Sequence, residues 1–253
     1  MRLYVIVKVL FYLRLLGGQL AHGLKELKKV KIMWFKSLRM DIAAAKKYDP
    51  AARNKFEIWL TYAGVHALSA HRVARFFYKI KLKLIARIIS QWTKFCTGIE
   101  IHPCAKIAPG VFIDHGEGVV IGETAEIGTG TIIYQGVTLG GTGKETGKRH
   151  PTVGEYCVIS AGAKVLGNIT VGDYAKIGAG AVVLKDVPAH ATCVGVPARV
   201  VRINGQETVD LTQEKEDPFK KELCALREKV FALEEKIADM QNANTNPNDN
   251  EQD

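Results

Sequence analysis

The chain has 253 residues, enough for one substantial core with an attached element, and its formal net charge is +9. A basic surface suits nucleic acid, membrane headgroups or a polyanionic small molecule, so charge alone selects no partner. The five cysteines form no CxxC pair, which argues against a zinc knuckle or a disulfide framework and favours a reducing, cytoplasmic location.

Residues 1–33 form an apolar and basic extension, which we expect to be poorly ordered. The apolar stretch from Leu3 to Leu16 contains Lys8 and Arg14, so it is too short and too interrupted to span a membrane. An alternative is that the basic run after it lies as a helix on a membrane surface. A new helix is expected to start just after Met33, a candidate for the true first residue.

Residues 34–97 have the pattern of a helical domain. Apolar residues recur at steps of three and four, as at Phe56, Trp59, Leu60 and Ala63. The pair Asp49-Pro50 is typical of a helix cap followed by proline in the first turn. Gly98 is expected to close this region.

A six-residue period then replaces the helical one, over residues 98–203. Small residues often follow the aliphatic position directly, as in Ile121-Gly122, or four positions later, as at Ala125. This pattern is typical of a hexapeptide β-helix, in which each aliphatic side chain points inward and small residues sit at the corners. The in-phase aliphatic positions are Ile101, Ile107, Ile113, Ile121, Ile127, Ile133, Leu139, Val153, Ile159, Val165, Val171, Ile177 and Val183.

Two insertions interrupt this rhythm, and each brings a histidine beside a charged residue. The first separates Ile113 from Ile121 and carries Asp114 and His115. The second separates Leu139 from Val153 and carries Arg149-His150 in a glycine-rich segment. A solenoid accepts extra residues on one face without disturbing its core, and such loops commonly hold function.

The repeat ends near Val201, and residues 204–218 are expected to be a linker. Residues 219–240 carry apolar residues at alternating steps of four and three, which predicts a short coiled-coil helix. The alternative is an amphipathic helix lying on its own subunit. The Asn- and Asp-rich residues 241–253 are expected to form a disordered tail.

Several strings resemble the serine O-acetyltransferase family: Ile-Asp-His-Gly (113–116), Gln-Gly-Val-Thr-Leu-Gly-Gly-Thr-Gly-Lys (135–144), Lys-Arg-His-Pro (148–151) and Gly-Val-Pro-Ala-Arg (195–199). The helical strings at 48–53 and 64–72 resemble that family's N-terminal domain, so the match covers roughly residues 34–205. The resemblance implies a mixed α + β chain: an N-terminal helical domain, a left-handed parallel β-helix and then the coiled-coil helix. It also implies acetyl transfer from acetyl-CoA to the L-serine hydroxyl in cysteine biosynthesis.

His115 is the candidate general base, because a serine hydroxyl needs a positioned imidazole to remove its proton as it attacks a thioester. An imidazole base also needs an acceptor on its other nitrogen. By resemblance that acceptor is Glu100. The family more often has Asp there, so the geometry at this longer side chain stays open, and Glu100 is alternatively a solvated strand-end residue.

The serine zwitterion requires groups of both signs. Arg149 can bind the carboxylate through two parallel hydrogen bonds. Asp49 and Asp114 can hold the ammonium, and His150 completes the pocket in the family. The role of Asp49 rests on the resemblance alone, and this residue is also explained as a helix cap.

Acetyl-CoA is expected as a co-substrate, with no permanently bound cofactor and no metal. Gly141 is a candidate for contact with the acetyl donor or for an oxyanion hole through its backbone N–H. By resemblance, Ala161 and Ala179 line a groove for CoA between adjacent β-helices. A site between subunits implies a homotrimer or a dimer of trimers.

Other functions remain open at this point. A hexapeptide acetyltransferase acting on another hydroxyl, such as that of a sugar, would also use a histidine base. A zinc enzyme on the same fold would need three histidine ligands, and no histidine lies between His115 and His150. We expect no nucleic-acid partner. We also expect no sulfhydrylase complex through the C-terminus, because Asn250-Glu251-Gln252-Asp253 is too polar to fill an apolar pocket.

Overall fold

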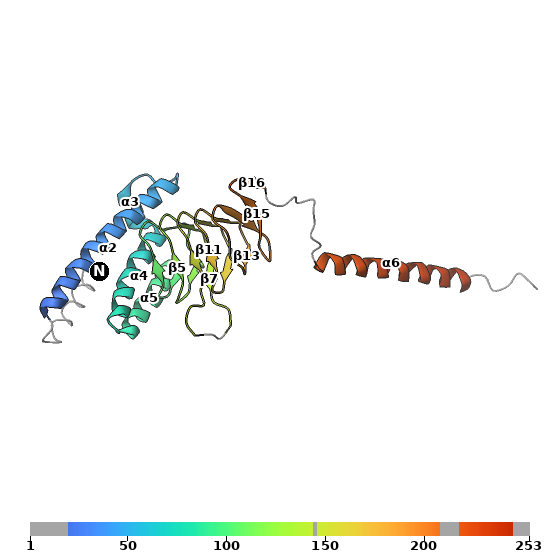
Figure 1. Ribbon diagram of the computed structural model, residues 1–253, viewed down its shortest axis with the longest axis horizontal. Helices are drawn as coiled ribbons and strands as arrows, with labels where there is room; N and C mark the ends of the chain where they lie inside the picture. Colours follow the sequence, from blue (N-terminus) through green and yellow to red (C-terminus); the bar gives the residue numbers. More distant parts are fainter. Residues whose placement is uncertain (1–19, 144–145, 208–217, 245–253) are drawn as a thin grey trace, which may run out of the picture. The chain divides into compact units, whose positions relative to one another are not determined.

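The computed structural model describes residues 20–143, 146–207 and 218–244. The chain divides into two compact units, residues 1–208 and 209–253, and each is described by itself. The first unit contains four described helices and a β-helix (Figure 1). The helices are α2 (Leu20–Tyr48), α3 (Lys55–Thr61), α4 (Ala63–Lys79) and α5 (Lys83–Thr97) in the first unit, and α6 (Pro218–Asn244) in the second.

Helix α2 differs from the expected boundary at Met33. It begins at Leu20 and passes Met33 without a break, so it includes part of the expected extension. The reason is that Leu20, Leu24 and Leu27 continue the helical spacing through the basic run. Residues 1–19, and with them the apolar stretch from Leu3 to Leu16, lie outside the described residues.

Local signals explain the ends of the other helices. The Asn54 side chain accepts a hydrogen bond from the Glu57 backbone N–H at 2.9 Å and so caps α3. Helix α5 ends at Gly98, whose φ of 71° is a left-handed conformation that glycine adopts at little cost. The expected closure of the helical region at Gly98 agrees with this C-cap.

The β-helix has short strands that stack into three sheets. Sheet A contains β1, β4, β7, β10 and β13; sheet B contains β2, β5, β8 and β11; sheet C contains β3, β6, β9, β12, β14, β15 and β16. The strands are β1 (Glu100–Ile101), β2 (Lys106–Ile107), β3 (Phe112–Ile113), β4 (Val120–Ile121), β5 (Glu126–Ile127), β6 (Ile132–Ile133), β7 (Thr138–Gly140), β8 (Thr152–Val153), β9 (Val158–Ile159), β10 (Lys164–Leu166), β11 (Thr170–Val171), β12 (Lys176–Ile177), β13 (Val182–Val183), β14 (Ala191–Val194), β15 (Arg199–Ile203) and β16 (Gln206–Glu207).

The predicted aliphatic ladder is confirmed. Each of the thirteen in-phase residues is the second residue of one of the strands β1 to β13, and all are buried except the half-buried Ile107. The register stacks them directly, as in the pairs Ile101↔Ile121 and Ile121↔Leu139 of sheet A. Each buried aliphatic side chain contributes roughly 1.5–3 kcal/mol, so the ladder is the main source of stability of this unit.

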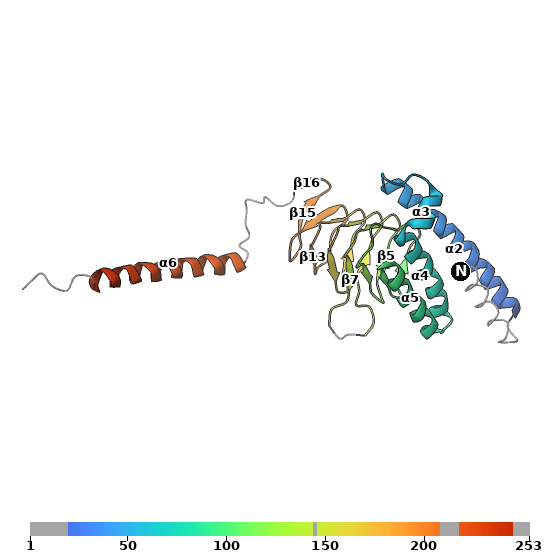
Figure 2. The same ribbon diagram turned by 180° about the vertical axis from the view of Figure 1, so that it is seen from behind.

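The helices gather at the end of the β-helix where the first coil begins (Figures 1 and 2). Ala67 and Leu68 of α4 join the buried core beside Ile99. Asp41 of α2 is fully buried, and its carboxylate accepts hydrogen bonds from the Arg72 guanidinium and, at 2.9 Å, from the backbone N–H of Gly110. These bonds connect α2, α4 and the β-helix at one point.

The other end of the β-helix closes differently. Strand β15 pairs with β14 in the antiparallel direction, and β16 pairs with β15 in the same way. On sheet A, the backbone N–H of Ala198 donates to Val182, and on sheet B Val187 forms a bridge with Val171. The last coil is therefore covered by antiparallel strands on sheet C and by non-strand segments on sheets A and B.

Helix α6 presents the expected heptad seam. The seam side chains that the structure describes have exposed fractions between 49% for Val230 and 70% for Leu223, with Leu226, Leu233, Ile237 and Met240 in between. Residues 208–217 of the expected linker and 245–253 of the expected tail lie outside the described residues, whereas the helix continues to Asn244. Among the described helices, none combines the length and apolar character needed to cross a membrane.

Candidate active site

The two insertions leave the β-helix at different edges. Residues 114–119 connect β3 of sheet C to β4 of sheet A, and we call this the C–A edge. Residues 141–151 connect β7 of sheet A to β8 of sheet B, at the A–B edge. His115 and His150 therefore lie at opposite edges of sheet A within one chain, so one chain alone does not bring them into one pocket.

His115 stands at the C–A edge with its imidazole in solvent. Its side chain is 73% exposed, and its backbone is left-handed with a φ of 57°. The Asp114 carboxylate accepts a hydrogen bond from the His115 backbone N–H at 3.0 Å, and its second oxygen lies 3.9 Å from His115 Nε2. The imidazole is thus accessible to a substrate and has an acidic neighbour.

Asp49 lies in the loop after α2 and is held by two donors. Its Oδ1 accepts from the backbone N–H of Ala51 at 2.8 Å, and its Oδ2 accepts from the hydroxyl of Tyr62. Burial, the Asp49 carboxylate and more distant acidic groups, Asp114 among them, raise the pKa of Tyr62 to about 12. The structure therefore brings Asp49 close to the Asp114 corner through Tyr62, a residue that sequence reasoning missed.

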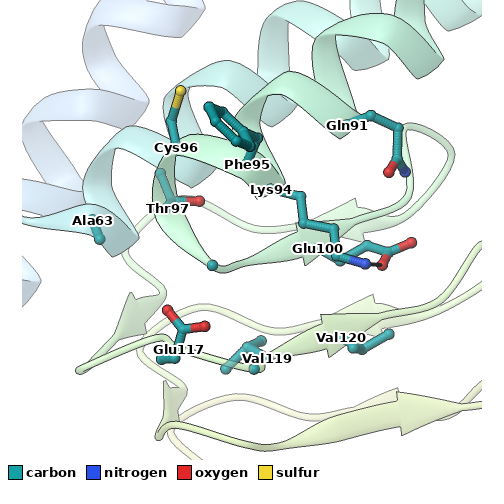
Figure 3. Close-up of a pocket in the computed structure, with 12 residues that line it drawn as sticks. Ala63, Gln91, Lys94, Phe95, Cys96, Thr97, Glu100, Glu117, Val119 and Val120 are labelled. Carbon is teal, nitrogen blue, oxygen red and sulfur yellow. Dashed lines mark hydrogen bonds and ion pairs between the residues drawn. The ribbon is translucent and has the colours of Figure 1, made fainter.

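Glu100 begins β1 and lines an open pocket of about 750 Å³ under the end of α5 (Figure 3). Its carboxylate accepts from Lys94 Nζ at 2.6 Å, an ion pair that is half exposed on the lysine side. The Glu117 carboxylate lies in the same pocket against Gly98, where an added Cβ would come within 2.0 Å of it. Within the described residues Glu100 is held by Lys94 and not by His115.

Arg149 and His150 are fixed at the A–B edge by the dipeptide Glu123-Thr124. Arg149 pairs with the Glu123 carboxylate at 3.2 Å. The Thr124 hydroxyl lies 2.9 Å from His150 Nδ1 and also accepts from the backbone N–H groups of both residues. Burial and the neighbouring guanidinium lower the pKa of His150, so its imidazole is neutral at pH 7.

Close backbone approach explains two glycines at this edge. A Cβ on Gly122 would overlap the His150 ring at 1.9 Å, so only glycine leaves room for it. A Cβ on Gly141 would lie 3.1 Å from the Arg149 carbonyl. His102 is also near, because the charges of Glu123, His150 and Arg149 act on its pKa, which burial lowers. Sequence reasoning also missed Glu123 and Thr124. The polar pair in the Gly-Glu-Thr string directly after Ile121 could have pointed to them.

A column free of side chains runs along the C–A edge above His115. Gly118 stacks on Gly136, which stacks on Gly162, at 3.6 and 3.5 Å from the position that a Cβ would take. Gly180 continues the column, and all four glycines have positive φ. Ala161 and Ala179 precede the last two of them and are half-buried and exposed. A long, narrow ligand has room to lie along this edge.

Within one chain, the candidate residues form two half-sites. Asp49, Asp114 and His115 meet at the C–A edge, with Glu100 and the small-residue column nearby. The A–B edge holds Arg149, His150 and Gly141. The described ranges contain no group of three or more acidic, cysteine or histidine side chains suited to a metal ion.

Comparison with known proteins gives a consistent result. A family model described as bacterial transferase hexapeptide (six repeats) matches residues 150–185. Serine acetyltransferase of Bacillus pumilus (strain SAFR-032) is 55% identical over 210 residues, which are 82% of this chain and 97% of that protein. The solved structure of Neisseria gonorrhoeae serine acetyltransferase in complex with serine has a TM-score of 0.66 at 41% identity, over 68% of this chain and 70% of that one. A serine acetyltransferase structure in complex with CoA has a TM-score of 0.66 at 42% identity, over 70% of this chain and 73% of that one.

Proposed function

The chain belongs to the serine acetyltransferase family and transfers acetyl from acetyl-CoA to the hydroxyl of L-serine in cysteine biosynthesis, and we propose that His115 is its general base. As the serine oxygen attacks the thioester carbonyl, the hydroxyl proton passes to the imidazole. Collapse of the tetrahedral intermediate breaks the C–S bond, and the proton passes on to the CoA thiolate. The observation that carries this role is the exposed imidazole at the edge where the glycine column Gly118, Gly136 and Gly162 runs.

Glu100 is proposed to orient His115 once substrate is bound. The ion pair with Lys94 keeps the Glu100 carboxylate at the mouth of the pocket beside the C–A edge. Because both partners are partly exposed, this ion pair is weak and can exchange for a hydrogen bond to the imidazole. Such an acceptor fixes the tautomer of the base and stabilises the imidazolium that forms.

Serine is proposed to bind between the C–A edge of one copy of the chain and the A–B edge of a neighbouring copy. Asp49 and Asp114 provide negative charge for its ammonium, and Arg149 and the neutral His150 provide donors for its carboxylate. The Glu123 carboxylate holds the Arg149 side chain ready at 3.2 Å before serine arrives. Acetyl-CoA is proposed to lie along the glycine column, beside Ala161 and Ala179. Gly141 would be contributed from the A–B edge of the neighbouring copy.

The two half-sites require a second copy of the chain, so we propose a homotrimer. Both edges border sheet A. If sheet A of each copy faces a threefold axis, the A–B edge of one copy lies beside the C–A edge of the next, which generates three identical sites. The outward residues at the start of the sheet B strands are all polar, whereas sheet A presents Val120 and Val182 outward beside Glu100, Thr138 and Lys164. Sheet B is therefore the better solvent face.

The seam of α6 supports the same assembly, because its apolar residues are exposed in one chain and a three-helix coiled coil would bury them. Pairing of two trimers is compatible with this arrangement. A cytoplasmic location is proposed because the cysteines in the described ranges are free thiols.

A thiol-release assay with acetyl-CoA and L-serine tests the reaction and the base. His115→Ala should lower kcat by about 10²–10⁴ while the oligomer persists, since general-base catalysis contributes a factor of this size. Near-normal turnover in the folded variant would show that another group is the base. A sugar acceptor offered in place of serine should give no thiol release.

Mixed oligomers test the shared site. His115→Ala and Arg149→Ala are each expected to be inactive alone. If they are co-expressed with different tags and mix randomly, about a quarter of the sites combine an intact base from one copy with an intact arginine from its neighbour. Recovered activity near that fraction supports the intersubunit site. Mixed oligomers without activity would contradict it.

A further inference from the structure

We propose that Tyr62 is a positioning residue for the acceptor amino acid, which holds the Asp49 carboxylate ready for the serine ammonium. The inference rests on the proposed function, which gives Asp49 its ammonium-binding role. Tyr62 itself need not touch the substrate. Its hydroxyl acts through the carboxylate that it binds.

Two hydrogen bonds fix the direction of the Asp49 carboxylate. Asp49 follows the last residue of α2, so the helix does not restrain its side chain. Oδ1 accepts from the backbone N–H of Ala51 at 2.8 Å, and Oδ2 accepts from the Tyr62 hydroxyl. Each carboxylate oxygen has a second lone pair, so both can still accept a hydrogen bond from an ammonium. The two donors thus set the direction of the carboxylate without blocking it.

Tyr62 lies where the helical domain packs against the β-helix. It is the single residue between α3 and α4, and its ring packs against the core that includes Phe112. Two residues later, Gly64 lies so close to β3 that a Cβ would come within 2.2 Å of the Ile113 carbonyl oxygen. Ile113 directly precedes Asp114 and His115. The hydroxyl is therefore anchored to the same corner that carries the proposed base.

The Tyr62 hydroxyl stays protonated. Burial and the surrounding carboxylates, Asp49 first, raise the pKa of Tyr62 to about 12, so the hydroxyl keeps its proton at neutral pH. It is therefore a permanent hydrogen-bond donor to the Asp49 carboxylate, and such a charge-assisted bond is a strong one.

Removal of this one oxygen has a specific kinetic consequence. Without the hydroxyl, the Asp49 carboxylate loses a charge-assisted hydrogen bond and can rotate away from the ammonium. We expect Tyr62→Phe to raise KM for L-serine about tenfold, a change typical of one lost hydrogen bond to a charged group. KM for acetyl-CoA should stay unchanged, and the pH profile of kcat should keep its shape because His115 is intact.

The experiment is a double-mutant cycle on the full-length oligomer with Tyr62→Phe, Asp49→Ala and the double variant. Steady-state thiol release gives KM for each substrate and kcat. Tyr48→Phe is the matched control, because Tyr48 packs against the same core as Tyr62 and adjoins Asp49 in sequence. It should behave as the unchanged protein. Circular dichroism at the assay temperature confirms that each variant is folded.

The double-mutant cycle distinguishes a wrong role for Tyr62 from a wrong role for Asp49. If both single variants raise KM for serine and the double variant equals Asp49→Ala, Tyr62 acts through Asp49 as proposed. If Asp49→Ala raises KM while Tyr62→Phe leaves it unchanged, or if the two effects multiply, the inference is wrong and the role of Asp49 stands. If Asp49→Ala has no effect on serine, the assignment of Asp49 fails and the inference fails with it.

Discussion

Acid is expected to destabilise this protein through His71, a buried histidine of α4. Its side chain lies in the core, and neither ring nitrogen has a hydrogen-bond partner of normal geometry. Burial, reinforced by the charges of Arg75 and Arg72, lowers the pKa of His71 from 6.5 to about 3, and the Ala105 backbone opposes this only in part. The folded protein therefore keeps this imidazole neutral under conditions in which the unfolded chain protonates it.

The magnitude follows from linkage between protonation and folding. The folded pKa is depressed for a base, so no stability is lost above pH 6.5, and stability falls as the pH drops from there toward 3. At pH 5 the unfolded state binds the extra proton in most molecules, which costs about 2 kcal/mol of unfolding free energy. The loss approaches about 5 kcal/mol below pH 3.

The assay is urea unfolding followed by circular dichroism at pH 7 and pH 5, at one fixed protomer concentration. The variant His71→Leu removes the titration and leaves the other ionisable groups in place, so it isolates the contribution of His71. The unchanged protein should lose about 2 kcal/mol more than His71→Leu between the two pH values. Parallel losses in both proteins would refute the reasoning.

Three further predictions concern the core, the donor groove and the last helix. Asp41→Asn should lower the unfolding free energy by about 3–5 kcal/mol, because it removes the buried charge that pairs with the mostly buried Arg72 side chain, and thermal melting measures the loss. Ala161→Trp should raise KM for acetyl-CoA at least about tenfold by filling the column on the C–A edge, with KM for serine unchanged in the thiol-release assay. Leu226→Asp combined with Leu233→Asp should open the α6 seam and lower the thermal midpoint of the oligomer while the β-helix keeps its activity, as sedimentation, melting and turnover would report.

Each of these has a control. Glu126→Gln breaks an exposed ion pair and should cost less than about 1 kcal/mol, so an equal cost for Asp41→Asn would contradict the buried role. An unchanged KM for acetyl-CoA in Ala161→Trp would move the donor to another edge. An unchanged midpoint after both leucine substitutions would show that α6 does not pair with its copies.

The repeat was predictable residue by residue because its signal is periodic. Each aliphatic position contributes one inward side chain, and the pleat of a short strand leaves no alternative register for it. The insertions were expected on one face, but counting the six-residue steps assigns each to its own edge. Ile113 ends the first coil and Leu139 begins the third, so the added residues after them fall on different edges.

Contacts between distant elements were not predictable from the sequence pattern. The Tyr62–Asp49 hydrogen bond depends on how α3 turns back toward the end of α2. The ion pair between Lys94 and Glu100 depends on the direction in which α5 enters the first strand. Neither pair has a characteristic spacing, because these contacts arise from packing of the helices and not from a repeat.

The covered ends of the β-helix have a consequence for how the protein exists at high concentration. A stack of parallel coils with a flush end would offer free N–H and C=O groups to the next molecule, and addition could continue without limit. Here, helices block one end, and at the other the reversed strand β15 and the two-residue β16 leave no parallel template. The capped ends therefore oppose end-to-end addition of further β-helices into fibres.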